Sequence, residues 1–574
     1  MTAATSSSSV SPCLRGESRA SSTWIVILLI LAAYYRIGFS EFTFWDDQVT
    51  IHHNGWFNPP TLATLKHYWT TPEMGLYVPV TSSVWAGLAA LAYVGLPDDY
   101  GIKLNPQIFH FTSILLHIVS SLLVLRILRR LIKAEVPALA GALLFALHPV
   151  QVETLGWTSG MKDLLCWCFA LAALLLYVRR VQAVATDGTS SWRGFELPVA
   201  FVLTVLAILS KPTAMVVPAA MGVIDVMLIR RPWRRVLLTL VPFFVLTIAG
   251  AILARDAQFV SHVKAAAIWQ RPFIVGDALA FYVRILSWPG TLTIDYGRTP
   301  AAVMASPLAY VWWLVPAAIG VVVIVAARRG SPLPLAALLI AGIGIGPVSG
   351  IATFQMQSYS TVTDHYLYFS MLGIAMLLAW MLCRWPAKWL RVVAFIVIAA
   401  FGVRTWFQTA VWHDSYTLFG HASDSNEKSF LAANNMAAVY LAKSPQDLVL
   451  AEHYVDIAYA RAPHDFFVMS NYAGIKVRVG KKELAYPAWE ECLEFIKRAP
   501  RQEDFRAAFC SEVALTLLAA DELDRAQHWV NEALAANPNE PSTANAASTV
   551  RAALATRAAT RPATRPTTTA TTQP

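Results

Sequence analysis

The sequence has few charged residues: Asp, Glu, Lys and Arg together make up 14% of its 574 residues. A soluble globular domain has about a quarter of its residues charged. Hydrophobic residues make up 56% of the chain, and the mean hydropathy is +0.49. The shortage of charge excludes a soluble globular protein of this length and predicts that lipid surrounds most of the chain.

Cysteine is also scarce, with six residues scattered along the chain, which excludes a disulfide scaffold. Cys166 and Cys168 lie in an apolar run without a nearby His or second pair, and this spacing is poor for a metal site. Cys492 and Cys510 could form a disulfide only if their domain lies outside the cytoplasm.

The net charge of +9 comes from basic clusters that separate apolar runs, for example at 126–130, 230–235 and 328–329. Such clusters are typical of cytoplasmic loops in membrane proteins. The basic balance therefore indicates membrane topology, and we expect no nucleic-acid partner.

Apolar segments long enough to be membrane spans, about 20 residues each, recur along the first 408 residues. They are 22–40, 107–128, 136–150, 162–179, 196–211, 213–229, 236–254, 308–327, 332–351, 366–383 and 389–408. Two amphipathic stretches, 79–96 and 276–292, are typical of helices that lie at the membrane interface. No small-x-small cleavage site follows the first segment, so we expect an uncleaved helix after a cytoplasmic tail at 1–21.

Eleven spans from a cytoplasmic N-terminus place five loops in the cytoplasm, and each contains Arg or Lys: 126–134, 179–195, 230–235, 328–331 and 384–391. The odd number of spans places everything after about residue 408 on the opposite side of the membrane. The first outer loop is then 41–106.

Helix pairs are predicted from 409 to 550, because Ala and Pro recur at a spacing typical of tetratricopeptide repeats. Two copies and a degenerate copy between them carry this pattern, at Ala451, Ala458 and Pro463; Gly474, Ala485, Trp489 and Pro500; and Ala526, Ala533 and Pro538. The Thr-, Arg- and Pro-rich segment 551–574 is predicted to be a disordered tail.

Two adjacent carboxylates, Asp46 and Asp47, follow the first span on the outer face. A carboxylate can act as the base that activates an attacking hydroxyl, and a second one can bind a metal or raise its neighbour's pKa. The alternative is an ordinary acidic pair that caps a helix at the membrane surface.

Three further polar groups return to the same face, where polar residues close to hydrocarbon are costly and often functional. They are His148 and Glu153 with Lys162 and Asp163; Lys211; and Asp364, His365, Tyr366 and Tyr368. The alternatives are a structural turn with Glu153 paired to Lys162, a snorkelling Lys and an interfacial aromatic belt.

These motifs occur in an order that resembles one family. The order is the acidic pair with Asn54; 77–80; Phe109-His110 with His117; 148–150 with Glu153; 160–165; 209–212; 364–368; and 412–415 ahead of the repeats. The combination resembles the transmembrane and tetratricopeptide-repeat O-mannosyltransferases and their bacterial relatives over nearly the whole chain before the tail.

The resemblance implies an all-α, polytopic GT-C membrane fold followed by an α-solenoid of helix pairs, with catalysis at Asp46 and Asp47. The donor phosphate would be bound by Lys162, Lys211, His365, Tyr366 and Tyr368, with support from His148, Glu153, Asp163 and Asp364. The family usually has Arg at the position of His365, so a permanent cation is replaced by one that titrates near neutral pH.

The implied activity is transfer of a sugar, with mannose expected, from a polyprenyl- or dolichyl-phosphate to Ser or Thr of secreted or membrane proteins. The donor is a substrate and the resemblance identifies no cofactor, although Asp46 and Asp47 could hold a divalent cation. The repeats would bind the acceptor in the periplasm of a bacterium or in the lumen of the endoplasmic reticulum. A glycan or lipid acceptor and a non-enzymatic membrane scaffold remain alternatives.

Overall fold

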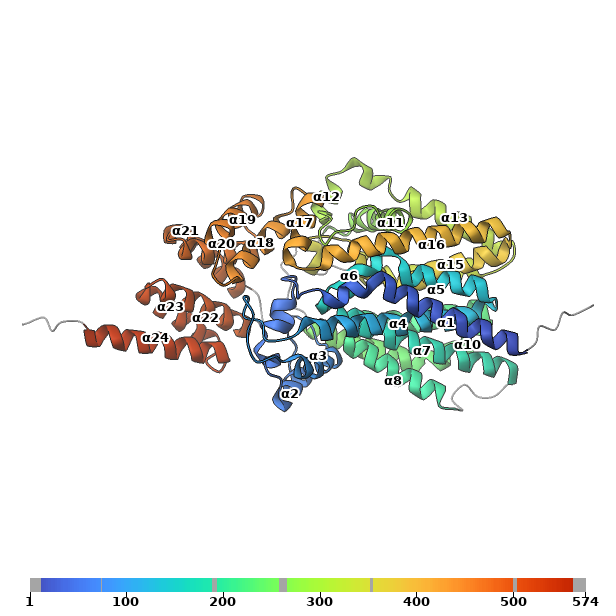
Figure 1. Cartoon of the computed structure of the whole chain (residues 1–574), viewed down its shortest axis with the longest axis horizontal. Coiled ribbons are helices and arrows are strands. Elements are labelled where there is room, and N and C mark those ends of the chain that lie inside the picture. Colours follow the sequence, from blue (N-terminus) through green and yellow to red (C-terminus); the bar gives the residue numbers. More distant parts are fainter. Residues whose placement is uncertain are drawn as a thin grey trace, which may run out of the picture. The chain divides into compact units, whose positions relative to one another are not determined.

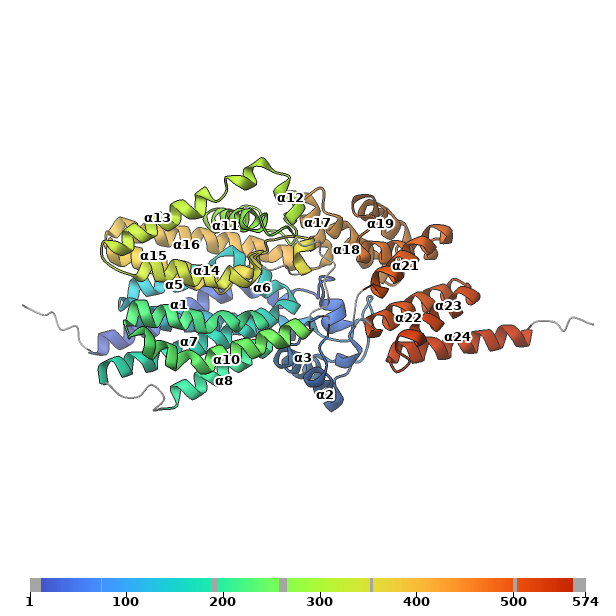
Figure 2. The same cartoon turned by 180° about the vertical axis from the view of Figure 1, so that it is seen from behind.

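The structure, a computed structural model, describes residues 12–73, 75–187, 194–257, 266–351, 355–498 and 503–560 (Figures 1 and 2). These residues form helices and loops, with two isolated β-bridges and no β-strand. The all-α prediction is confirmed. The chain divides into two compact units, Met1–Asn435 and Met436–Pro574.

Each of the eleven predicted apolar segments is helical. The helices are α1 (Pro12–Tyr34), α4 (Pro106–Ile132), α5 (Glu135–Leu147), α7 (Met161–Asp187), α8 (Glu196–Ser210), α9 (Val217–Val223), α10 (Trp233–Ala257), α13 (Leu314–Arg328), α14 (Leu333–Ile345), α15 (Ser370–Arg384) and α16 (Lys388–Thr409). In the described part of the chain, seven helical segments are long and apolar enough to cross a membrane. An eighth span is formed if α5 and the segment Pro149–Gly156, bent by 48°, cross together. The protein is therefore a multi-pass membrane protein, and the count of eleven stays a prediction because α8, α14 and α15 are short.

The spans pack through small residues, as membrane helices do when nothing but close contact favours their association. A Cβ on Gly141 of α5 would lie 2.6 Å from the carbonyl oxygen of Ala375 in α15. Gly373 of α15 approaches the backbone of α14 at Ala337 in the same way. Helix α7 packs against both α4 and α8, so the N-terminus of α7 is held by its neighbours.

The loop between α1 and α4 is a packed structure that contains α2 (Leu62–Thr70) and α3 (Pro79–Ala92). Its apolar side chains form a core with Phe109 of α4 and with Met161 and Leu165 of α7; they include Phe42, Ile51, Phe57, Tyr68 and Trp85. The acidic pair therefore sits on a loop that is fixed to two membrane helices. The same unit also contains α6 (Val152–Gly156), α11 (Arg271–Ser287) and α12 (Pro300–Met304).

Two predicted boundaries differ from the structure at the ends of the chain. Helix α1 begins at Pro12, so 12–21 is helical, and residues 1–11 lie outside the described residues. The expected disordered tail at 551–574 is wrong for 551–560, because α24 (Pro541–Thr560) continues through them. This segment is rich in Ala, the strongest helix former, and Val550 is fully buried. Residues 561–574 lie outside the described part.

The division between the units falls after Asn435, later than the boundary at 409 expected from the sequence. Helix α17 (Ser415–Ser425) belongs to the membrane unit because its side chains form hydrogen bonds with residues of that unit. The Ser415 hydroxyl accepts the amide N–H of Phe44 at 3.0 Å, and His421 Nε2 lies 2.9 Å from the Leu292 carbonyl.

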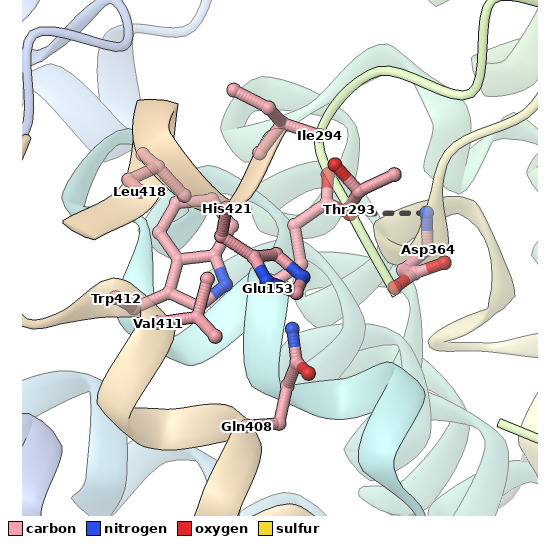
Figure 3. Close-up of a pocket in the computed structure, with 9 residues that line it drawn as sticks. All are labelled: Glu153, Thr293, Ile294, Asp364, Gln408, Val411, Trp412, Leu418 and His421. Atoms are coloured by element: carbon pink, nitrogen blue, oxygen red, sulfur yellow. Dashed lines mark hydrogen bonds between the residues drawn. The ribbon is translucent and has the colours of Figure 1, made fainter. Parts of the chain in front are cut away.

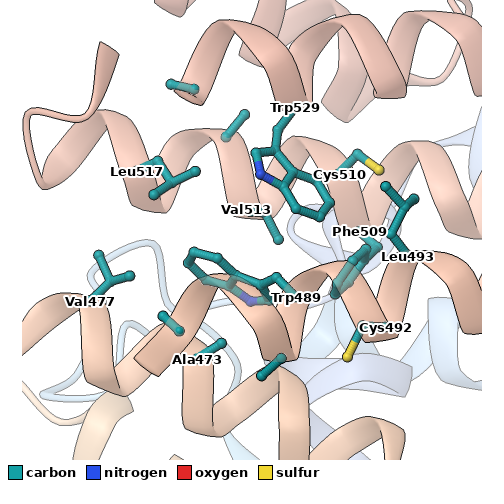
Figure 4. Close-up of a cluster of buried hydrophobic side chains, with 14 of the residues drawn as sticks. Ala473, Val477, Trp489, Cys492, Leu493, Phe509, Cys510, Val513, Leu517 and Trp529 are labelled. Carbon is teal, nitrogen blue, oxygen red and sulfur yellow. The ribbon is translucent and has the colours of Figure 1, made fainter. Parts of the chain in front are cut away.

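The C-terminal unit is built from successive antiparallel helices: α18 (Phe430–Ala442), which enters it, α19 (Leu448–Arg461), α20 (Phe466–Arg478), α21 (Lys482–Lys497), α22 (Glu503–Ala519), α23 (Leu523–Ala536) and α24. The predicted small positions are buried, among them Ala451, Ala458, Ala485, Ala526 and Ala533. Trp489, Phe509 and Trp529 fill the space between them (Figure 4). Cys492 and Cys510 are free and buried, so the conditional disulfide is absent.

Candidate active site

The acidic pair lies in a tight turn whose backbone is unusual. Asp46 has φ of 66°, in the left-handed region that non-glycine residues seldom adopt and that Asp and Asn tolerate best. Its carbonyl oxygen accepts the N–H and the hydroxyl of Thr50, both at 2.9 Å. This turn separates the side chains of Asp46 and Asp47, which have different surroundings.

Asp47 is fully buried and its carboxylate accepts four hydrogen bonds. One oxygen accepts the N–H and hydroxyl of Ser159, at 2.8 and 2.7 Å, and the other accepts the N–H and hydroxyl of Thr43, at 3.2 and 3.1 Å. Burial raises the pKa of Asp47 to about 6, although the bonds from Ser159 and Thr43 oppose the rise. Asp47 therefore fixes the loop to the turn before α7 and has no free oxygen for a substrate.

Asp46 is the accessible member of the pair, and its carboxylate has no hydrogen-bond donor among the described residues. The protein that surrounds this accessible side chain raises its pKa, and the positive charge of Lys162 opposes that rise. An accessible carboxylate with free oxygens and a raised pKa is suited to accept a proton.

Lys162, at the start of α7, supplies a buried cation beside Asp46. It is 8% exposed, and its Nζ lies 4.5 Å from the centre of the Trp157 ring. The Trp157 indole N–H in turn donates to the carbonyl of Trp45 at 2.6 Å, which ties the cation's platform to the acidic loop. Lys162 forms no ion pair with any residue that the structure describes. A buried cation that forms no direct ion pair is a candidate site for binding an anion.

Lys211 and Asp163 form an ion pair next to this cation. Both carboxylate oxygens of Asp163 accept from Lys211 Nζ at 2.7 Å, and both side chains are largely buried. Lys211 thus has a partner that the sequence did not predict, and the alternative in which Glu153 pairs with Lys162 is wrong. With Lys211 neutralised, Lys162 is the stronger candidate for binding a phosphate.

Glu153 joins α6 to the turn Asp364–Leu367 that precedes α15 (Figure 3). It accepts the N–H of Asp364 at 3.1 Å and lies 2.6 Å from Nδ1 of His365. Burial, together with the charges of Lys211 and Lys162, lowers the pKa of His365 to about 3. His365 is therefore neutral at physiological pH, and the expectation that it titrates near neutrality is not supported.

Asp364 links Glu153 to Tyr296 in the same hydrogen-bond network. The Tyr296 hydroxyl donates to Asp364 at 2.7 Å, and burial together with the charge of Glu153 holds the pKa of Asp364 well above its ordinary value. Glu153 and Asp364 line a small cavity with Gln408, Trp412 and His421, with room for about one water molecule. Tyr366 is partly exposed beside them. Burial raises its pKa most, and the charges of Asp163 and Glu153 also raise it.

Two predicted site residues lie outside this cluster. Tyr368 is fully buried, with its hydroxyl 2.9 Å from Nδ1 of His117 in α4, so it belongs to the helix core. His148 is also buried, accepting the N–H of Val150 and lying 3.1 Å from the carbonyl of Leu286. Tyr368, which was expected to contact the donor, and His148, which was expected to support the site, are both packed inside the fold.

Sequence reasoning missed the residues that position the pair. Thr43 stands four residues before Asp47, a spacing at which a hydroxyl can reach a carboxylate in a turn, so it could have been found. Ser159 has no comparable signal, because it comes from a distant part of the chain, and the same is true of Tyr296, which donates to Asp364.

The described residues contain no group of three or more His, Cys, Asp or Glu side chains arranged to hold a metal ion. Since the oxygens of Asp47 are engaged by Ser159 and Thr43, only Asp46 of the pair is free to contact a cation.

Comparisons with known proteins connect this site to a family. Residues 105–255 match a family described as dolichyl-phosphate-mannose-protein mannosyltransferase. The protein O-mannosyl-transferase Tmtc2 of Drosophila melanogaster is 26% identical over 243 residues, which is 40% of this chain and 25% of that protein. This chain is related to the protein O-mannosyl-transferases. No solved structure matches it.

Human relatives among the protein O-mannosyl-transferases agree. TMTC3 is 27% identical over 183 residues, 30% of this chain and 18% of that protein, and TMTC4 is 30% identical over 165 residues, 26% and 21%. The chain spans a quarter or less of the length of these protein O-mannosyl-transferases. The family match contains Glu153, Lys162, Asp163 and Lys211 and ends before His365.

Proposed function

We propose that this protein transfers mannose from a polyprenyl- or dolichyl-phosphate donor to Ser or Thr of a polypeptide on the non-cytoplasmic face of the membrane. The names of the relatives support mannose and a protein acceptor. The membrane spans and the buried, unpaired Lys162 support a lipid-linked phosphate donor.

In the proposed reaction the acceptor hydroxyl oxygen attacks C1 of mannose and the bond from C1 to the phosphate oxygen breaks. The hydroxyl proton passes to the carboxylate of Asp46, which is the free base of the acidic pair. Lys162 stabilises the negative charge that the departing lipid phosphate gains. Asp47 and Ser159 are positioning residues that hold the base beside the cation.

The observation that carries this proposal is the contrast within the acidic pair. Both carboxylate oxygens of Asp47 accept hydrogen bonds, four in total. Asp46, one residue away, is accessible, and the buried Lys162 is the opposite charge that acts on it. A surface helix cap would need neither the buried anchor nor the unpaired cation.

The direct test is transfer of radiolabelled mannose from polyprenyl-phosphate mannose to a panel of secreted proteins by the full chain in lipid nanodiscs. We expect label on Ser or Thr of protein acceptors. Label only on a glycan or a lipid would replace the acceptor part of the proposal, and no transfer from this donor to any acceptor would contradict the whole.

Lys162→Met should lower kcat about 100-fold and raise the KM for the donor, because it removes the cation that the phosphate would contact. The substitution keeps the length of the side chain, so the melting temperature should stay within a few degrees. Lys66→Met, at an exposed position of the same outer loop, is the matched control and should have no effect. Unchanged donor kinetics in Lys162→Met would remove Lys162 from the site.

Ser159→Ala should raise the pKa of Asp47 by about one unit, because it deletes one of four hydrogen bonds that favour the ionised form. The acidic fall in the pH profile of kcat/KM should move to higher pH by the same amount, while the rate at pH 8 stays near that of the wild type. Thr158→Val changes the adjacent buried hydroxyl, which has no hydrogen-bond partner, and should leave the profile in place. An equal shift in both variants would indicate general loosening of the turn.

The C-terminal unit should lie on the outer face with Asp46 if eleven spans cross the membrane. Val449→Cys in α19 places a thiol at a side chain that is 80% exposed. An impermeant maleimide should label this thiol in intact cells and leave the native, exposed Cys383 at the end of α15 unlabelled. The reverse pattern would overturn the topology.

A further inference from the structure

Several arginines lie where α4 and α7 end, at the opposite end of these two spans from the acidic pair. The starts of both helices belong to the core that holds the acidic loop, through Phe109 of α4 and Met161 of α7, and the helices pack against each other. At about 1.5 Å per residue, α4 rises roughly 30 Å from Phe109 to Arg130. This length equals the hydrocarbon thickness of a bilayer, about 30 Å, so the arginines lie at the depth of lipid head groups.

Gln182 of α7 joins the two helix ends at this depth. Arg130 Nη1 of α4 donates to its Oε1 at 3.3 Å, and its Nε2 donates to the carbonyl of Arg130 at 3.5 Å. Arg179 stands three residues before Gln182, and Arg126 stands four before Arg130, so each lies one turn away on the same side of its helix. All three arginines are exposed. Their guanidinium groups therefore gather along one seam between α4 and α7.

The positive charge of this seam is not neutralised by an acidic side chain. Arg126, Arg130 and Arg179 form no ion pair with any residue that the structure describes. Glu135, at the start of α5, is engaged by Arg129, whose Nε donates to it at 3.0 Å. Arg130 and Arg179 are close enough for their charges to repel each other. Since helix packing holds them together, an anion between the two guanidinium groups would relieve this repulsion.

An exposed apolar stripe of α4 leads to the seam. Phe111, Leu115 and Val119 recur every four residues on one side of the helix, and all three are exposed. The same side continues towards Arg126. A surface with an apolar length and a basic end matches a phospholipid, whose acyl chain would lie along α4 while its phosphate contacts the arginines.

We propose that the seam between α4 and α7 binds an anionic phospholipid, with its phosphate between Arg130 and Arg179 and with Arg126 beside it. Basic pockets between membrane helices are sites of this kind, and guanidinium groups match the geometry of a phosphate. Arginines that only set the topology would not need to converge from two helices on one glutamine. The inference is independent of the proposed function, because it involves neither the sugar donor nor the acceptor.

The test compares melting temperatures of the full chain in nanodiscs of phosphatidylcholine alone and of four parts phosphatidylcholine to one part phosphatidylglycerol. Native mass spectrometry of the same samples counts the lipid that stays bound. The double variant Arg130→Gln with Arg179→Gln removes two charges from the seam. Its matched control, Arg328→Gln with Arg329→Gln, removes two charges from exposed arginines at the end of α13.

We expect phosphatidylglycerol to raise the melting temperature of the wild type by about 3 °C, since it binds the folded state. The seam variant should lose this shift and the retained lipid, and the control should keep both. In phosphatidylcholine alone the seam variant should be at least as stable as the wild type, because the repulsion between Arg130 and Arg179 is gone. Arg130→Lys with Arg179→Lys keeps the charges and should keep most of the shift.

A wild type that melts at the same temperature in both lipids, or a shift that survives in the seam variant, would overturn the inference. An equal loss of the shift in the control would show a general effect of surface charge and would also overturn it. Millimolar inorganic phosphate is added to phosphatidylcholine nanodiscs as a further arm. If it reproduces the full shift, the seam is a site for a free anion, and the lipid is not its ligand.

Discussion

Asp46→Asn is expected to lower mannose transfer at least about 1,000-fold, since general-base catalysis contributes about 10²–10⁴ and the amide cannot accept the proton. Stability should change little. The carboxylate of Asp46 has no hydrogen bond to lose among the described residues, and Asn tolerates the left-handed backbone of this position as well as Asp does. The measurement is single-turnover transfer beside the melting temperature in the same detergent.

Asp46→Gly separates the effect of this position on activity from its effect on stability. Glycine adopts φ of 66° without a steric cost, so this variant should be at least as stable as the wild type and equally inactive as Asp46→Asn. Turnover near that of the wild type in either variant would show that the base lies elsewhere. A joint loss of stability and activity would point to a structural role for the side chain.

Asp47→Asn should reduce transfer about 100-fold for a different reason. Its amide oxygen can still accept both bonds from Ser159, but its NH₂ group faces the N–H of Thr43, and a buried donor left unsatisfied costs about 1–3 kcal/mol. Loss of the buried charge offsets part of this cost, so the melting temperature should move little while the loop loses its hold on Thr43.

The pH dependence of mannose transfer should show whether Asp47 is the group that titrates. The pKa of Asp47 is raised to about 6 in the folded state, so its proton is gained as pH falls through 6 and transfer should fall with it. A raised pKa means that the folded state holds more protons between about pH 4 and 6. The contribution of Asp47 to the free energy of unfolding therefore decreases by about 3 kcal/mol as pH rises across that window and stays constant above it.

In Asp47→Asn the residual activity should lose this acidic fall. A profile of kcat/KM from pH 5 to 8 for the wild type and the variant decides the matter. An acidic limb that persists unchanged in Asp47→Asn would assign the titration to Asp46, whose pKa is also raised.

The sequence was sufficient to predict the helical segments and the loop that carries the acidic pair, because both depend on local patterns of apolar and charged residues. It did not separate the roles of Asp46 and Asp47, which look alike in sequence. The difference comes from Ser159, which stands 112 positions away, and from the turn at Asp46. Contacts of that range leave no local periodicity.

The same limit explains the errors among the cations. Lys162, Lys211 and His365 were treated as equivalent because each lies at one membrane face in the predicted topology. Their charges depend on neighbours from other elements. Asp163 pairs with Lys211, burial and the charges of Lys211 and Lys162 keep His365 neutral, and of the three only Lys162 has no ion pair with a described residue. The prediction at the C-terminal end was wrong for a different reason. Low sequence complexity suggested disorder from residue 551, but the Ala-rich helix α24 continues to Thr560.

Asp47 is fastened to Ser159, and Lys162 follows three residues later on the same chain. Asp46, the proposed proton acceptor, adjoins Asp47, so the hydrogen bonds from Ser159 to Asp47 fix the acidic loop to the start of α7, where Lys162 lies. When bilayer thickness changes, membrane helices tilt or slide to match it, and sites assembled from separate spans change shape. Here base and cation would move together, so we expect the proposed transfer to depend little on bilayer thickness.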